Sequence, residues 1–187
     1  AFYMLFDKEN FLRQLRKVIY ALTSEKTANR ILYNGGRIHN IFQSFIVGKA
    51  LDSLIIGILA FIGLTLIKAP LVLVLSLIIG VTNMIPYFGP FIGGVPVVFI
   101  VLLTNGIMPA IWTALFIFAL QQFDGLILGP RILGDSVGIS PFWIICSITI
   151  FGSLFGFLGM FLGVPLICVI RMFFNDFLEY RKNRIKD

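Results

Sequence analysis

Charged residues are missing from two long stretches of the chain, which are otherwise rich in apolar residues. Between Lys68 and Asp124 the sequence has no Asp, Glu, Lys or Arg, and between Asp135 and Arg171 it again has none. Both stretches exceed the roughly 20 apolar residues that a helix needs to cross a bilayer. The pattern therefore predicts an all-α integral membrane protein, a polytopic helical bundle.

The N-terminal part follows a different pattern, which predicts cytoplasmic amphipathic helices over residues 7–48. Apolar residues recur at helical spacing over residues 7–22, with three basic side chains off that face. Such a helix could lie on anionic lipid headgroups or pack on its neighbours. A second helix is expected over residues 24–48. Residues 1–6 are interpreted as the end of an upstream transmembrane helix, so we expect the chain to be a fragment of a longer protein.

Residues 49–174 are expected to form the transmembrane transport region, beginning with a full span at about Ala50–Ile67. The next two apolar pieces, Leu71–Met84 and Phe91–Thr104, are each only about 21 Å long as helices, short of the ~30 Å hydrocarbon core. Two prolines and a glycine within Ile85–Pro90 interrupt them, because proline has no amide donor. The pair is therefore either a re-entrant hairpin or two short tilted spans.

A second full span and a second broken segment complete this region. The span Ile107–Leu128 becomes polar toward its end. The apolar stretch Pro141–Phe174 would be about 51 Å long as one helix, so a break is expected within it. Four glycines mark the expected break, although they equally suit close helix packing as small-xxx-small pairs. They are Gly152, Gly156, Gly159 and Gly163.

A full span followed by a broken pair thus occurs twice along the chain. This order predicts two broken or re-entrant helical hairpins that line a pathway. Broken segments at corresponding positions of two halves point to a transporter's binding site, since irregular backbone at membrane depth must be buried in protein or line a watery cavity. The residues expected along a substrate or ion pathway are Asn83, Pro86, Tyr87, Gly89, Pro90, Gln121, Gln122, Asp124, Arg131 and Asp135.

Several charged residues near these breaks have two interpretations each. Arg131 could form a cytoplasmic gate with Asp135, or it could pair with Asp124 as a structural lock at the end of the span. Asp52 could face a basic loop or a watery cavity. Alternatively, it complements the dipole in the first turn of its helix.

The placement of positive charge predicts orientation. Most of the 15 Lys and Arg residues flank the apolar stretches, at the N-terminal end and in the basic tail of residues 175–187. By the positive-inside rule, both ends of the chain are expected in the cytoplasm, in the membrane of a bacterial cell. The same placement argues against a nucleic-acid partner despite the net charge of +6, because the basic residues form no stripe through a folded domain.

Enzyme motifs are missing from the sequence. It contains no HExxH, no phosphate-binding GxxxxGK[ST] and no nucleophile-elbow serine, and it has a single histidine, His39. Cys146 and Cys168 fall in apolar segments and are interpreted as small buried side chains. We therefore expect no enzyme activity, no cofactor and no metal site.

Four motifs then stand out in order along the chain: Ile85-Pro86-Tyr87-Phe88-Gly89-Pro90, Gln121-Gln122-Phe123-Asp124-Gly125, Gly129-Pro130-Arg131-Ile132-Leu133-Gly134 and Gly152-Ser153-Leu154-Phe155-Gly156-Phe157-Leu158-Gly159-Met160. Together they resemble the autoinducer-2 exporter (AI-2E) family of permeases, over about residues 2–174. The resemblance implies a protein about twice this long, homo-oligomeric assembly and an elevator-like movement. Family members often carry Glu where Asp124 stands.

The resemblance and the pattern together favour a secondary transporter that exports a small polar solute such as autoinducer-2. The first alternative is a sodium/proton antiporter with Asp124 as the exchanging carboxylate, since the family is described in both ways. The second alternative is a membrane scaffold without transport activity. The expected partners are the lipid bilayer, a small polar solute or a cation, and further copies of the same chain.

Overall fold

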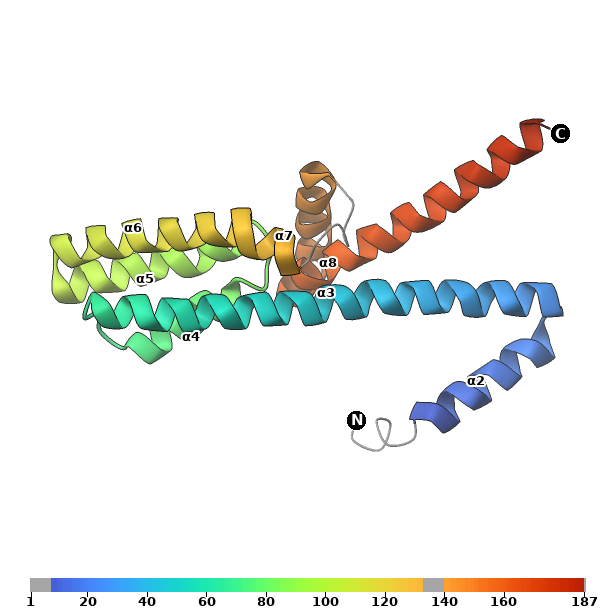
Figure 1. Ribbon diagram of the computed structural model, residues 1–187, viewed down its shortest axis with the longest axis horizontal. Helices are drawn as coiled ribbons and strands as arrows, with labels where there is room; N and C mark the ends of the chain where they lie inside the picture. The colour runs from blue at the N-terminus through green and yellow to red at the C-terminus, as the bar shows by residue number, and fades with distance from the viewer. Residues whose placement is uncertain (1–7, 133–139, 187) are drawn as a thin grey trace. The chain divides into compact units, whose positions relative to one another are not determined.

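The computed structural model describes residues 8–132 and 140–186, which form helices and no strand (Figure 1). Three helical stretches are long and apolar enough to cross a membrane, namely Glu25–Leu66, Ile107–Leu128 and Pro141–Glu179. The prediction of an all-α membrane protein is confirmed. The sequence analysis also led to expectations for residues 1–6 and for Asp135. These lie outside the described residues.

The chain divides into two compact units, Ala1–Asn40 and Ile41–Asp187. The first contains helix α2, Lys8–Leu22, and the beginning of α3, Glu25–Leu66. Within it, the Tyr20 hydroxyl donates a hydrogen bond to Asn29 Oδ1 over 2.5 Å.

Helix α3 corrects the expectation of two separate helices over residues 24–48 and 50–67. It is continuous through Gly48, because an isolated glycine costs only about 1 kcal/mol in a helix and no proline interrupts the segment. Asp52 consequently lies deep inside α3. The interpretation that it complements the dipole in a first turn is wrong.

Helix α3 ends in a Schellman motif. The Ala69 amide donates to the Leu64 carbonyl over 3.0 Å, and the Lys68 amide donates to the Thr65 carbonyl over 3.0 Å. Lys68 has a φ of 58°, the left-handed conformation for which glycine is the usual residue. The turn sends the chain back into α4.

The first broken pair forms a hairpin of two short helices, α4 at Val72–Thr82 and α5 at Gly89–Asn105. The break between them covers residues 83–88. Proline and glycine at the end of this break start α5, since proline fits the first turn of a helix. Tyr87 has a φ of 63°, which is unusual for a residue other than glycine.

Helix α6, Ile107–Phe123, is the second span, and a single π-helical turn, η1 at Asp124–Leu128, extends it. The short helix α7, Gly129–Ile132, follows. Such π-turns are rare and frequently occur at functional sites.

Helix α8, Pro141–Lys186, contains the second break. Gly156 has φ 60° and ψ −140°, a conformation that no helix contains and that only glycine adopts without strain. The two arms then pack closely. A Cβ on Gly159 would lie 1.9 Å from the Phe151 carbonyl oxygen, and one on Gly163 would lie 3.0 Å from the Ser147 oxygen. The glycines of this segment therefore serve both the turn and the packing.

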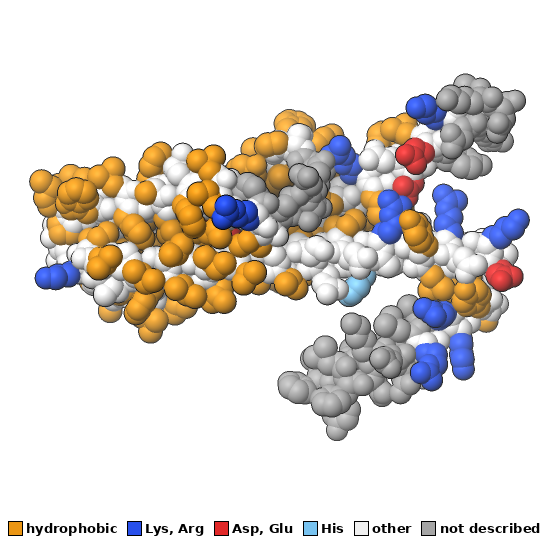
Figure 2. Space-filling model, in the orientation of Figure 1, with side chains coloured by type: hydrophobic (Ala, Val, Ile, Leu, Met, Phe, Trp, Pro, Cys, Tyr) orange, Lys and Arg blue, Asp and Glu red, His pale blue; other side chains and the backbone are white. Residues whose placement is uncertain are grey.

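The second unit has its main core among α3, α4, α5 and α6, which lie side by side in Figure 1. Two glycines let α3 and α4 cross closely, since a Cβ on Gly80 would lie 3.1 Å from the Cα of Gly57. The outer side of these helices is apolar in Figure 2, where orange side chains cover most of the surface that α4, α5 and α6 present. Large exposed side chains such as Leu73, Leu103 and Trp112 contribute to it. Such a surface suits contact with lipid tails.

Candidate functional site

The two broken segments meet in a small core. Ile85, in the first break, packs with Ile148 from the first arm of α8 and with Phe161 and Val164 from the second arm. Phe45 of α3 completes this core, and its ring centroid lies 5.6 Å from that of Phe161. Both hairpins and the first span are therefore in contact at one place.

A buried charged cluster lies one helical turn further along α3, and we define it as Lys49, Asp52, Asn83 and Asp124. The Lys49 ammonium pairs with Asp52 Oδ2 over 2.5 Å. The Asn83 side-chain amide donates to the same oxygen over 3.2 Å. The Asp124 carboxyl lies near Asp52, Asn83 and Lys49.

Three elements position these four side chains. Lys49 and Asp52 are three residues apart, so they share one face of α3. Asn83 is the residue at which α4 stops, and its own amide still donates to the Ile79 carbonyl over 3.0 Å. Asp124 opens the π-turn at the end of α6. The cluster thus depends on both the first break and the irregular turn.

All four side chains are almost completely removed from solvent. The exposed fraction is 0% for Asp52, 2% for Asn83, 5% for Lys49 and 9% for Asp124. With every group ionised, two carboxylates and one ammonium leave one uncompensated negative charge, which is costly to bury.

One oxygen of the cluster lacks a donor. Asp52 Oδ1 is buried and has no hydrogen-bond partner among the described residues. A proton on Asp124 would cancel the excess charge of this buried cluster. The geometry therefore places two carboxyl groups and one ammonium in a buried cluster, with Lys49 paired to Asp52.

A cavity of about 880 Å³ adjoins this cluster. It brings together six of the residues expected along a pathway, namely Pro86, Tyr87, Pro90, Gln121, Gln122 and Asp124. Lys49 also lines it, whereas most of the remaining wall consists of apolar side chains of α5 and α6.

The other predicted pathway residues lie elsewhere. Asn83 belongs to the buried cluster behind the cavity. Gly89 packs against the end of α4, where a Cβ would lie 2.1 Å from the Thr82 carbonyl oxygen, and thus closes the break. Arg131 is exposed on α7, and within the described residues no ion pair joins it to Asp124. Asp124 faces the α3 cluster instead, so the structural lock with Arg131 does not form here.

The sequence interpretation did not place Lys49 and Asp52 among the pathway residues. A signal was present, because two opposite charges stand three residues apart directly before a long apolar run. What the sequence did not reveal is their partner Asn83, which lies 31 residues away from Asp52 along the chain.

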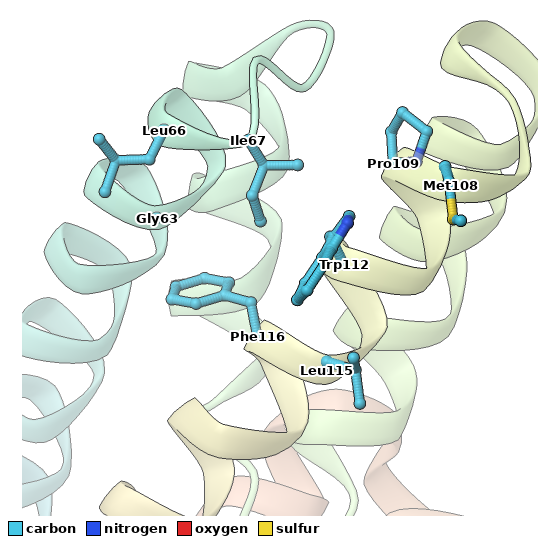
Figure 3. Close-up of a pocket in the computed structure, with 8 residues that line it drawn as sticks. All are labelled: Gly63, Leu66, Ile67, Met108, Pro109, Trp112, Leu115 and Phe116. Atoms are coloured by element: carbon cyan, nitrogen blue, oxygen red, sulfur yellow. The ribbon is translucent and has the colours of Figure 1, made fainter.

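A second hollow of about 680 Å³ lies between the end of α3 and the beginning of α6 (Figure 3). Phe116 of α6 points toward Gly63 of α3, and Ile67, which directly follows α3, points toward α6. No charged side chain and no predicted pathway residue lines this hollow. Among residues 8–132 and 140–186, no group of three or more His, Cys, Asp and Glu side chains is placed to hold a metal ion. The charged cluster and its cavity are thus the candidate site.

Comparison with known proteins places the chain among transporters. The model of the AI-2E family transporter matches residues 1–179. YrrI of Bacillus subtilis (strain 168) is 35% identical over 181 residues, which cover 97% of this chain and 50% of that protein. YueF of the same organism is 32% identical over 183 residues, which cover 98% of this chain and 48% of that protein. PerM of Escherichia coli (strain K12) is 31% identical over 176 residues, which cover 91% of this chain and 47% of that protein.

YrrI and YueF are named provisionally as transport proteins, and PerM is named provisionally as a permease. The chain spans about half the length of the curated relatives it matches.

Proposed function

The chain belongs to the AI-2E family of transporters, and on that premise we propose that it carries the solute pathway of a secondary transporter in the bacterial cytoplasmic membrane. The observation that carries this proposal is the contact of both broken hairpins beside a buried charged cluster that opens onto a cavity. Broken helices that enclose polar groups at membrane depth are the usual construction of a transporter's binding site.

In this proposal the full-length protein acts as a homo-oligomer, with both ends of the present chain in the cytoplasm. The support for this orientation is the concentration of Lys and Arg in residues 8–49 and 181–186, on either side of the apolar stretches.

The first candidate solute is small and polar, such as autoinducer-2, and the protein would export it. The cavity offers amide and carboxyl groups from Gln121, Gln122 and Asp124, which can donate and accept hydrogen bonds. Gln121 Nε2 is buried and has no partner among the described residues, so a bound solute could accept its hydrogen bond.

The second candidate function is exchange of a cation, such as sodium, for a proton. The observation in its favour is the burial of two carboxyl groups, Asp52 and Asp124, beside one ammonium. A proton on Asp124 would balance the charge of this cluster and would be given up when a cation arrives. Lys49 would keep the pair's remaining charge balanced.

A membrane scaffold without transport activity is the weakest of the three readings of this site. A buried ion pair contributes little to stability after desolvation, and an apolar core of the same volume is often more stable. A scaffold would therefore gain nothing from the Lys49–Asp52 pair or from the third charge beside it.

The test is flux through the full-length protein in liposomes, comparing wild type with Asp124→Asn. Autoinducer-2 flux and sodium-dependent proton movement are followed side by side, and Glu179→Gln, an exposed carboxylate on α8, is the matched control. Solute flux without proton movement supports the exporter, and sodium-dependent proton movement that Asp124→Asn abolishes supports exchange. If neither flux exceeds that of empty liposomes, the proposal of a transporter is wrong.

A further inference from the structure

We infer that the cavity binds a lipophilic organic monocation and exchanges it for a proton held by the buried cluster. This inference rests on the proposed exchange function and names its substrate class. It starts from the mismatch between the two ends of the cavity, one of which is charged while the other is almost wholly apolar.

The apolar end argues for a solute with a large apolar body. Aromatic side chains from the first break, α5 and α6 line this end of the cavity, which is open, since each of these side chains is itself exposed: Tyr87, Phe91, Phe99 and Phe118. A polyhydroxylated solute would leave its hydroxyl groups unpaired against such a wall, at a cost for each unpaired group. An apolar body would instead bury surface there.

The charged end argues for a single positive charge on that body. Lys49 and Asp124 line the cavity, and Asp52 lies directly behind them. Once the cluster loses its proton, it has one excess negative charge that a monocation would neutralise. Aromatic faces nearby also attract organic cations.

Sodium fits this site less well than an organic cation does. An inorganic ion must replace its water shell with oxygen ligands, and the apolar side chains of α5 and α6 that form most of the cavity wall supply none. A delocalised organic cation has little hydration to lose. The cavity volume of about 880 Å³ also falls in the range of pockets for drug-sized molecules, about 300–1,000 Å³.

Charge and protons balance in the exchange. Without the cation, Lys49 is positive, Asp52 is a carboxylate and Asp124 holds the proton, so the cluster is neutral. When the cation binds, the Asp124 O–H bond breaks, the proton passes to water, and two carboxylates face Lys49 and the cation. Both states are neutral, which allows either to be enclosed at membrane depth. The exchange is accordingly one cation for one proton.

The experiment measures binding of tetraphenylphosphonium to purified full-length protein in detergent, with proton release recorded in weakly buffered solution. Tetraphenylborate, an anion of the same shape, is the matched control ligand. We expect tetraphenylphosphonium to bind and release one proton per site, while tetraphenylborate does neither. Equal binding of both ions, or tetraphenylphosphonium binding without proton release, would overturn the inference.

Two variants separate the contribution of the negative charge to binding from the contribution of the cavity volume. Asp124→Asn should weaken tetraphenylphosphonium binding by about tenfold or more and abolish proton release, since the excess negative charge is gone. Val98→Trp fills the cavity from α5 and should weaken binding while leaving the charged cluster intact. Unchanged binding in both variants would contradict the inference.

The outcome also distinguishes this inference from the proposed function. If the protein exchanges sodium for protons in liposomes but does not bind tetraphenylphosphonium, the substrate class is wrong and the exchange function stands. If tetraphenylphosphonium binds with proton release but no solute crosses the liposome membrane, the binding site stands and the transport function is wrong.

Discussion

Replacement of Lys49 by methionine tests whether the buried cluster behaves as one electrostatic unit. Methionine keeps the length and much of the volume of the lysine side chain, so the packing change should cost less than about 1.5 kcal/mol. The charge effect is larger. Lys49 donates to the fully buried Asp52 over 2.5 Å, and removing one partner of a buried pair typically costs about 3–5 kcal/mol.

The loss of stability should be smaller when both Lys49 and Asp52 are replaced. In Lys49→Met/Asp52→Leu no charge of the pair remains, and buried pairs replaced by apolar residues are often neutral in stability. Asn83 then loses its acceptor, which restores a cost of about 1–3 kcal/mol. We therefore expect the double variant to be more stable than Lys49→Met alone.

The assay is the free energy of unfolding of the full-length protein, obtained by titration of mixed micelles with a denaturing detergent. The two single variants and the double variant form a thermodynamic cycle with the wild type. Additive effects of the two substitutions, or a Lys49→Met variant as stable as the wild type, would refute the reasoning. Either result would mean that Lys49 and Asp52 do not interact in the membrane protein.

Three further predictions concern the backbone, and the same unfolding assay checks each. Gly159→Ala should destabilise the protein by about 1–3 kcal/mol, because the new Cβ would lie 1.9 Å from the Phe151 oxygen; wild-type stability would argue that the arms of α8 do not pack here. Gly35→Ala, in α3 with nothing within 4 Å of the new Cβ, should stabilise by about 1 kcal/mol, and a loss of stability would contradict a helix at that position. Lys68→Gly should stabilise the protein by about 1 kcal/mol, because glycine adopts a φ of 58° without strain, whereas Lys68→Ala should not stabilise it. Equal effects of the two substitutions would exclude the left-handed conformation at this position.

The positions of both breaks could be predicted from the sequence because local chemistry decides them. Proline has no amide donor, and Pro86 and Pro90 stand close together with a glycine, so the sequence predicts a break there. A single proline is not enough, since Pro96 lies inside α5 and Pro165 inside α8. In α8, only glycine adopts φ 60° and ψ −140° without strain, so the break had to fall on one of the glycines there, and it falls on Gly156.

The charged cluster could not be predicted in the same way, because tertiary contacts decide it. The sequence places Asp52 and Asp124 at the ends of expected spans, but it does not state which side chains they face. Asn83 reaches Asp52 only because α4 folds back along α3, where Gly57 and Gly80 allow a close crossing. The continuity of α3 through Gly48 was missed for a related reason, since one glycine weakens a helix without ending it.

The central claim is that Asp52 and Asp124 act together in transport, and proton movement in an Asp52→Asn variant tests it most directly. Full-length wild type, Asp52→Asn and Glu179→Gln are reconstituted in liposomes, and proton movement driven by a cation gradient is recorded. The account predicts that Asp52→Asn abolishes proton movement even though Asp124 is intact, while Glu179→Gln behaves as wild type. Proton movement that persists in Asp52→Asn at the wild-type rate would contradict the account.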